Sequence, residues 1–247
     1  MKTALMISAL AVSLNACAID EVGVEQNEVP AESDSDDPVH EKLSANAMSP
    51  DMLLATSIPV GKLTSTYANN MAATPEGRHV LHYLIGCALG TNVSQAATYL
   101  VNGVPTTTTY YGSVGLHTGW KAFSPTLTQQ RVISSCMLSR MNEYGASLTI
   151  SIRGSSYSLD TGETTNYRKQ EGAFFGNVFN GGDNYWGSCQ GVDETHPSRQ
   201  CAQDGHCGMA WEGNCSSACT GTASNLSCTA NGITWPTATV FLNEADY

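Results

Sequence analysis

The cysteines of this 247-residue chain constrain its fold more than any other feature. The chain has nine of them, and six fall between residues 189 and 228, where Gly, Asn and Ser are common and large apolar side chains are few. A segment of that composition cannot hold its shape through a hydrophobic core alone. It needs covalent cross-links or a bound metal, and the choice depends on the compartment in which the chain resides.

The first 17 residues have the composition of a bacterial export signal. Lys2 supplies a positive charge, and the apolar run over residues 4–14 is too short to span a membrane as a permanent helix. The run ends in Leu14-Asn15-Ala16-Cys17, which resembles the lipobox of bacterial lipoproteins. The resemblance implies lipidation at Cys17 and a membrane attachment, most naturally to the outer membrane. An ordinary signal peptide cleaved nearby is the alternative.

Residues 18–51 are predicted to form an acidic, disordered tether. They hold ten of the chain's 22 acidic residues and a single base, Lys42. A segment with this much charge and few apolar side chains gains too little from burial to offset its loss of conformational entropy. The net charge of −11 is therefore mostly a property of the tether. Because the chain has no basic patch that would displace counterions from phosphates, we expect no nucleic-acid partner.

Two helices that each carry a cysteine are predicted in the body, residues 52–180. Thr74 and Pro75 are typical of a helix start, and the apolar spacing that follows places Cys87 on the inner face. The second helix is expected to begin with a capping box of Thr126 and Gln129 and to end at Gly145. Its apolar stripe is expected to consist of Ile133, Cys136, Met137, Met141 and Tyr144.

Arg140 projects into the same apolar stripe. Its stem would pack while its head reaches water, or its guanidinium would form a partly buried ion pair, with Glu143 as the nearest candidate.

Strands are predicted on both sides of the second helix. Asn102-Gly103 is a strong signal for a hairpin with a type I′ turn, and residues 148–153 alternate as expected of a strand with one buried face. The apolar run 172–179 is expected to be buried. These patterns predict an α+β fold, with two disulfide-linked helices packed on a small, mostly antiparallel sheet. A Cys-rich, irregular C-terminal subdomain follows over residues 181–247, and its last strand returns to the body.

In an exported chain, the eight cysteines after Cys17 are expected to form four disulfides. We predict a Cys87–Cys136 bridge, because both residues lie on inward helix faces and far from the other six. Those six would pair among themselves, in an order that the sequence leaves open: Cys189, Cys201, Cys207, Cys215, Cys219 and Cys228.

A zinc site is the competing interpretation of these cysteines. Cys215 and Cys219 are close in sequence, and Asp204 and His206 lie next to Cys207. No second tight pair has the matching spacing, so we expect neither a metal nor a cofactor.

No common catalytic motif is present, whether G-x-S-x-G, H-E-x-x-H or a phosphate-binding loop. Asp193, Glu194 and His196 form the best candidate for acid–base catalysis, although such a cluster is also common in polar loops. Trp186 and Trp211 lie in Gly-rich, polar surroundings. They would either fill a small disulfide-framed core or present a ring face to a sugar or a peptide side chain.

Three stretches resemble a group of secreted lipoproteins of myxobacteria: Arg131–Gly145, Ile150–Gly154 and Glu171–Asn177. The likeness spans roughly residues 78–180. That group has no assigned activity, so the resemblance implies export, an α+β body and disulfides, and it transfers no catalytic residue.

The sequence therefore predicts a lipid-anchored extracytoplasmic protein of the bacterial cell envelope with a binding or structural role. Its ligand would be a glycan or a protein, and the sequence gives no oligomeric state. A secreted hydrolase that uses the loop of Asp193 and His196 is the alternative.

Overall fold

The computed structural model describes residues 48–145, 147–157, 161–193, 196–197 and 199–246, together with the backbone of 43–45. All of these lie in the unit Asp36–Tyr247. The predicted export signal with Cys17, and the predicted tether as far as residue 42, fall outside the described residues.

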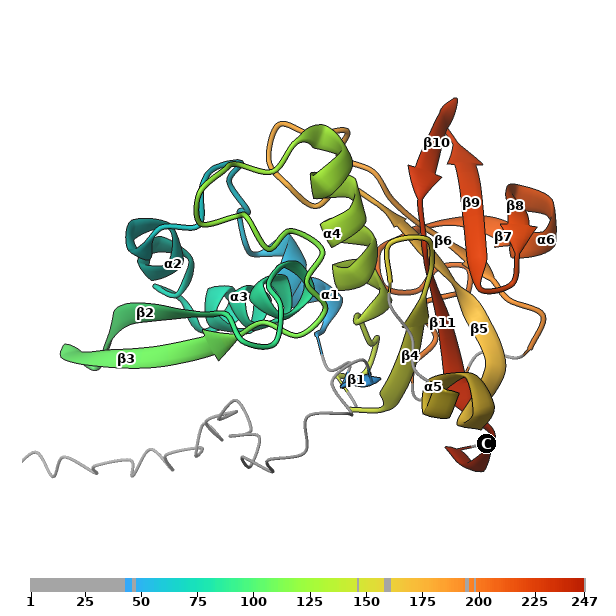
Figure 1. Cartoon of the computed structure of the whole chain (residues 1–247), viewed down its shortest axis with the longest axis horizontal. Coiled ribbons are helices and arrows are strands. Elements are labelled where there is room, and N and C mark those ends of the chain that lie inside the picture. The colour runs from blue at the N-terminus through green and yellow to red at the C-terminus, as the bar shows by residue number, and fades with distance from the viewer. Residues whose placement is uncertain are drawn as a thin grey trace, which may run out of the picture. The chain divides into compact units, whose positions relative to one another are not determined.

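A six-stranded sheet lies at the centre of the described structure (Figure 1). Its strands are β1 (Leu43–Ala45), β4 (Thr149–Arg153), β5 (Tyr167–Gly176), β6 (Trp186–Gln190), β7 (Ala210–Asn214) and β11 (Ala238–Asn243). The spatial order is β1-β4-β11-β5-β6-β7, so the strand that comes last along the chain lies inside the sheet. Every neighbouring pair is antiparallel except β6 and β7, which run parallel.

Helices α3 (Pro75–Ala88) and α4 (Leu127–Ser139) lie on one side of this sheet, which we call the helical face. The two helices are linked by a disulfide, and α4 contacts β5 and β11 directly. The side chains of Ile152, Phe174 and Val240 point to this side and belong to the main hydrophobic core. The predicted α+β class, with two disulfide-linked helices on a mostly antiparallel sheet, is confirmed.

The opposite side, which we call the cystine face, is covered by a second sheet together with the four-residue helix α6 (Cys215–Ala218). This sheet consists of β8 (Cys219–Thr222), β9 (Asn225–Ala230) and β10 (Ile233–Pro236), all antiparallel. Side chains alternate along a strand, so Ala173 and Phe175 face this side whereas Phe174 between them faces the helices. They join a small core with Cys189, Cys215, Cys228, Ala230 and Trp235.

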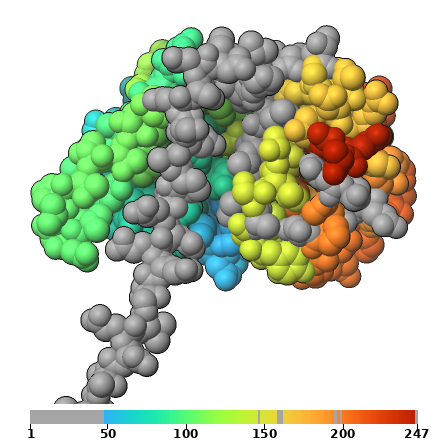
Figure 2. All heavy atoms as spheres, turned by 90° about the horizontal axis from the view of Figure 1, so that it is seen from below, coloured from blue at the N-terminus to red at the C-terminus, as the bar shows by residue number. Residues whose placement is uncertain are grey.

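The hairpin of β2 (Ser94–Val101) and β3 (Val104–Tyr111) forms a separate two-stranded sheet. Figure 2 shows it in green at the opposite end from the orange and red residues of the C-terminal part of the chain. Asn102 and Gly103 both have positive φ, 50° and 81°, as the predicted type I′ turn requires. The remaining helices are short: α1 (Pro50–Leu54), α2 (Ser65–Met71), α5 (Thr161–Asn166), α6 (Cys215–Ala218) and the 3-10 turn η1 (Glu244–Asp246).

Both predicted helix starts are confirmed. The Thr74 hydroxyl accepts a hydrogen bond from the Gly77 amide at 3.0 Å, and Pro75 occupies the first turn. Thr126 and Gln129 form the complete capping box at the start of α4. These contacts satisfy amides that a helix start leaves without intrahelical partners.

The predicted end of α4 is wrong. The helix stops at Ser139, and Met141 pairs instead with Met48, while the Asn142 amide donates to the Met48 carbonyl at 2.9 Å. Pairing with this distant residue replaces the last helical turn. Tyr144, predicted to be on the buried stripe, is 59% exposed, and Gly145, although left-handed at φ 65°, closes a turn rather than the helix.

The strand that follows has two buried faces instead of the predicted one. In β4, Ser151 and Arg153 are as buried as Ile150 and Ile152. The Arg153 guanidinium lies 3.7 Å from the centre of the Phe241 ring and donates to the Glu163 carbonyl at 2.8 Å. Burial lowers the pKa of this guanidinium.

Arg140 does not extend to water, because only 4% of it is exposed. Its guanidinium donates to the Ser113 hydroxyl at 3.3 Å and lies 6.0 Å from the centre of the Tyr83 ring. The carboxylate of Glu143, the nearest ion-pair candidate in the sequence, accepts a hydrogen bond from the Cys207 amide at 2.5 Å.

The boundary predicted between tether and body at residue 52 is too late. Residues 43–45 already form β1, and the side chain of Met48 is fully buried.

Candidate functional site

Four disulfides join the eight cysteines that follow Cys17. The predicted Cys87–Cys136 bridge is confirmed, with 5.9 Å between its Cα atoms and both residues fully buried. The other six pair among themselves, also as predicted, in an order that the sequence leaves open: Cys189–Cys215, Cys201–Cys207 and Cys219–Cys228. Four structural disulfides indicate an extracytoplasmic protein.

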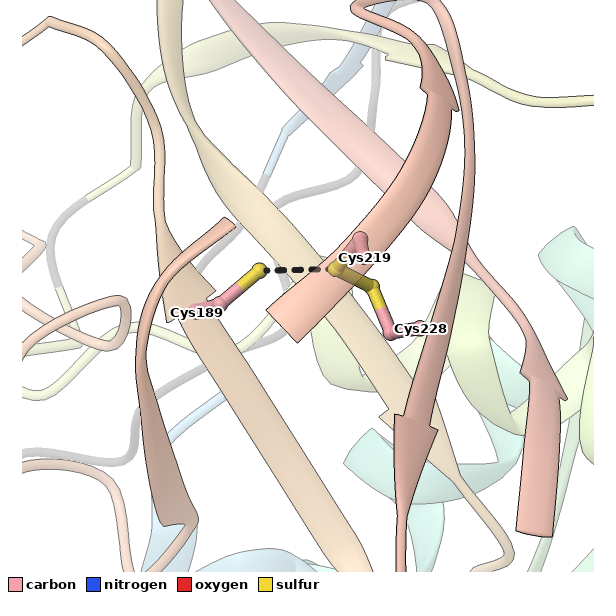
Figure 3. Close-up of side chains that lie close together, drawn as sticks. All are labelled: Cys189, Cys219 and Cys228. Atoms are coloured by element: carbon pink, nitrogen blue, oxygen red, sulfur yellow. Dashed lines mark hydrogen bonds between the residues drawn. A yellow bond between two sulfur atoms is a disulfide. The ribbon is translucent and has the colours of Figure 1, made fainter. Parts of the chain in front are cut away.

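Two of these bridges touch each other. Figure 3 shows that the Cys189 sulfur points at the Cys219 sulfur, and the two Sγ atoms lie 3.4 Å apart. The contact is not a thiol hydrogen bond, since each sulfur is already in a disulfide with another partner. The sulfurs of Cys189, Cys219 and Cys228 all lie within 4.8 Å of one another.

This cluster has the residue types of a metal site but not the required chemical state. Zinc and other soft metals bind the thiolate form of cysteine, and all three sulfurs of the cluster are committed to S–S bonds. In the oxidised protein the cluster is therefore a pair of packed disulfides.

The Asp193 carboxylate, a candidate for acid–base catalysis, holds a loop against β5. One of its oxygens accepts a hydrogen bond from the Gln170 amide at 2.7 Å. The other oxygen lies 3.7 Å from the Lys169 ammonium. The Asp193 amide donates in turn to the Gln170 carbonyl at 3.2 Å. His196 is partly buried in the same loop and its carbonyl accepts the Arg199 amide, while Glu194 lies outside the described residues.

Trp186 and Trp211 are brought together by the sheet. Ser188 pairs with Trp211 across the parallel β6–β7 ladder, and Trp186 lies two residues before Ser188. Because side chains alternate along a strand, both tryptophans project from the same side of the sheet on neighbouring strands. Trp186 is partly buried against the main core, and Trp211 is 39% exposed.

A groove of about 390 Å³ runs beside Trp186, and Trp211 is not part of its lining. Its walls are partly apolar, with one amide side chain, and they come from α1, the turn before β6 and the start of β7: Leu54, Asn184, Tyr185, Trp186, Gly208 and Ala210. The volume lies within the range of small-molecule sites.

Tyr185 forms a fixed wall of this groove. Its ring stacks on Trp235, with 5.4 Å between centroids, and on Phe175, with 6.2 Å, while its hydroxyl donates to the Glu212 carboxylate. Burial raises the pKa of the Tyr185 phenol, and the bond to Glu212 raises it further, so the hydroxyl stays protonated. Trp186 is therefore the ring that remains to contact a ligand.

A buried ion pair joins Glu171 and Arg199, and no spacing in the sequence marks the two residues as partners. Both side chains are fully buried, and the Arg199 Nε donates to the two carboxylate oxygens at 2.9 and 2.8 Å. Its Nη2 donates to the Ser139 carbonyl at the end of α4, at 3.0 Å. The pair thereby fixes the loop after β6 to both the sheet and the helix.

Comparisons with family models, with curated proteins and with solved structures find no match for this chain. Among the helices of the described residues, none has both the length and the apolar run that a membrane span needs.

Proposed function

We propose that this chain is a lipid-anchored binding protein of the bacterial cell envelope that holds a glycan at the Trp186 groove. The observation that carries the proposal is a groove lined by Trp186, Tyr185 and the amide side chain of Asn184. Trp211 projects from the same side of the neighbouring strand but does not line the groove. Sugar rings present apolar C–H faces edged by hydroxyls. An aromatic ring with a nearby amide matches both features.

The walls of the groove are preorganised for binding. Tyr185 is held by two stacked rings and by Glu212, and Trp186 belongs to a strand in the central sheet. A rigid wall loses little conformational entropy when a ligand binds. Leu54, which is 64% exposed on α1, adds an apolar side chain at the rim.

The anchor is supported by the cysteine count. All eight cysteines among the described residues are in disulfides with one another, and the ninth cysteine of the sequence is Cys17, which lies outside the described residues. It is also the residue on which the lipobox resemblance falls. The likeness to secreted myxobacterial lipoproteins over residues 78–180 favours the same location, with the outer membrane as the proposed site.

Titration of the purified full-length protein with soluble oligosaccharides tests the binding proposal. N-acetylhexosamine and hexose oligomers are added while tryptophan fluorescence and heat are recorded. We expect one series to bind, and Trp186→Ala to weaken its affinity about fivefold, since aromatic contacts are worth roughly 0.5–1.5 kcal/mol. Asn184→Gly should also weaken binding, and it keeps the backbone relaxed because Asn184 has φ 42°.

Phe123→Ala is the matched control, because Phe123 is an exposed aromatic residue that does not line the groove. Its affinity should equal that of the wild type. Each variant is first checked for four disulfides by mass spectrometry. The glycan site would be overturned if no oligosaccharide binds. It would also be overturned if Phe123→Ala and Trp186→Ala lose affinity to the same extent.

The anchor has its own test, which does not depend on the ligand. Cells that express the protein are fed a labelled fatty acid, and the wild type should carry label and partition into the detergent phase. Cys17→Ser should lose both properties. Label that persists in Cys17→Ser, or a wild type that stays aqueous, contradicts lipidation at this residue.

A further inference from the structure

The two touching disulfides on the cystine face differ in their access to solvent. Cys189, Cys215 and Cys228 are buried, whereas Cys219, whose sulfur lies in the same buried cluster, is only partly buried as a residue of the edge strand β8. Of the four cysteines, Cys219 is therefore the one nearest to solvent. Access of this kind is one of the factors that decide which sulfur of a disulfide is attacked.

A cavity of about 320 Å³ lies beside the other bridge. It is lined by the chain neighbours of both its cysteines, namely Gln190 next to Cys189, and Asn214 and Ser216 on either side of Cys215. Gly191 and Val192 complete the lining, and Val192 is 81% exposed. The Cys215 end of the pair of bridges thus adjoins an open, partly polar space.

We propose that Cys189, Cys215, Cys219 and Cys228 form a thiol–disulfide exchange centre that passes reducing equivalents from Cys219 in the edge strand β8 to Cys215, whose chain neighbours line the cavity. The contact that couples the two bridges is the 3.4 Å approach of the Cys189 and Cys219 sulfurs. The co-reactant is a dithiol, either a small molecule or the reduced active site of an envelope oxidoreductase.

In the first step, one thiolate of the dithiol attacks the Cys219 sulfur. The Cys219–Cys228 bond breaks, and Cys228 leaves as a thiolate that takes up a proton. The second thiolate of the dithiol then attacks its own sulfur in the mixed disulfide and releases Cys219 as a thiolate. The dithiol has lost two electrons and has become a disulfide.

In the second step, the Cys219 thiolate attacks the Cys189 sulfur, 3.4 Å away. A Cys189–Cys219 bond forms, the Cys189–Cys215 bond breaks, and Cys215 leaves as a thiolate that takes up a proton. The net product has one bridge in place of two, with thiols at Cys215 and Cys228. Cys189 stays in a disulfide throughout. The disulfide cross-links to β9, through Cys228, and to α6, through Cys215, are lost.

Wild-type protein treated with limiting dithiothreitol at about pH 8.5, near the pKa of a free thiol, provides the first test. Acid quenching, alkylation and non-reducing peptide mapping then show which cysteines are free. We expect label on Cys215 and Cys228 together with a Cys189–Cys219 peptide. Label on Cys219 and Cys228 with an intact Cys189–Cys215 bridge would overturn the proposal.

Two single variants should each form the Cys189–Cys219 bridge, one by freeing Cys219 and the other by freeing Cys189. Cys228→Ser leaves Cys219 as the attacking thiol, and Cys215→Ser leaves Cys189 as the attacking thiol. Both should yield the Cys189–Cys219 bridge without added reductant, with Cys215 free in the first variant and Cys228 free in the second. If both retain the original remaining bridge, the two disulfides do not exchange.

Cys207→Ser is the matched control for these variants. It frees Cys201, and no third sulfur among the described residues forms a close group with that pair. Cys201 should be alkylated while the other three bridges stay unchanged. Scrambling of equal extent in this control would show that any free thiol rearranges the protein, and the specific centre would be rejected.

Discussion

The two faces of the central sheet are held by different means. On the helical face, the main core gathers 36 buried apolar residues among those described, and two disulfides lie within it. On the cystine face, seven buried residues form the core, three of them are cysteines, and two disulfides again lie within it. Cross-links here replace the apolar area that a small second sheet cannot bury.

The comparison predicts that the two faces differ in their dependence on disulfides. Replacing Cys189, Cys215, Cys219 and Cys228 by Ala removes loops of 26 and 9 residues, together worth about 6 kcal/mol on the chain-entropy model. The cystine face should then lose its order while the helical face keeps a cooperative transition. Near-UV circular dichroism from Trp235 and hydrogen exchange of β8–β10 measure this.

A single transition in which both faces melt together would break the comparison. It would mean that the small sheet is an integral part of the main core and not an independently stapled layer.

Replacing Cys87 and Cys136 by Ala should have a smaller and different effect. The loop of 49 residues is worth about 4 kcal/mol on the same model. Because the large apolar core remains, we expect a lower urea midpoint with a native spectrum and with the other three bridges intact. A loss of native signal comparable to that of the fourfold variant would show that the helical face depends on its disulfide as strongly as the cystine face does.

The buried Glu171–Arg199 pair sharpens the comparison, because it ties the loop between the faces to α4. Glu171→Gln leaves the guanidinium buried without a counter-charge, which typically costs 3–5 kcal/mol. We expect the free energy of unfolding, measured with urea, to fall by about 3 kcal/mol. This is the lower end of that range, because the loop can open and let water reach the guanidinium. Lys169→Gln is the control, because its partly exposed pair with Asp193 should contribute less than about 1 kcal/mol. Equal losses would contradict the assigned role of Glu171.

The smallest effect is expected at the tip of the β2–β3 hairpin, which lies away from the two residues, Ala97 and Tyr110, that the hairpin contributes to the main core. Gly103 has φ 81°, and an added Cβ would meet no atom within 4 Å. Gly103→Ala should therefore cost only the left-handed backbone penalty of about 1 kcal/mol. A thermal melt measures this loss of stability. Asn102→Gly is the control, and its stability should stay within a few tenths of a kcal/mol of the wild type. A larger loss of stability would indicate that the turn at the hairpin tip stabilises the packing on the helical face.

Local signals in the sequence predicted local structure. The Thr74 cap, the Thr126–Gln129 box and the Asn102-Gly103 turn depend on residues within one turn of each other, and all are present. The Cys87–Cys136 bridge followed from two inward helix faces. The two disulfide-linked helices are therefore the part of the fold that the sequence predicts most directly.

Long-range pairing accounts for what the sequence did not predict. The end of α4 is decided by Met48, some 90 residues earlier along the chain, which no helix pattern contains. Ser151 and Arg153 look solvent-facing by alternation, yet other elements cover them. Glu171 and Arg199 have no spacing that marks them as partners, and the contact of Cys189 with Cys219 requires β6 and β8 to be placed in three dimensions.

The position of β11 has a consequence for the order in which the chain folds. This strand follows every other strand in the sequence, yet it lies between β4 and β5. β4 and β5 therefore cannot join into one sheet during synthesis until residues 238–243 have emerged, whereas β5, β6 and β7 can pair earlier. The two parts of the sheet stay separate until the last strand is made, and this long-range pairing gives the fold a high contact order.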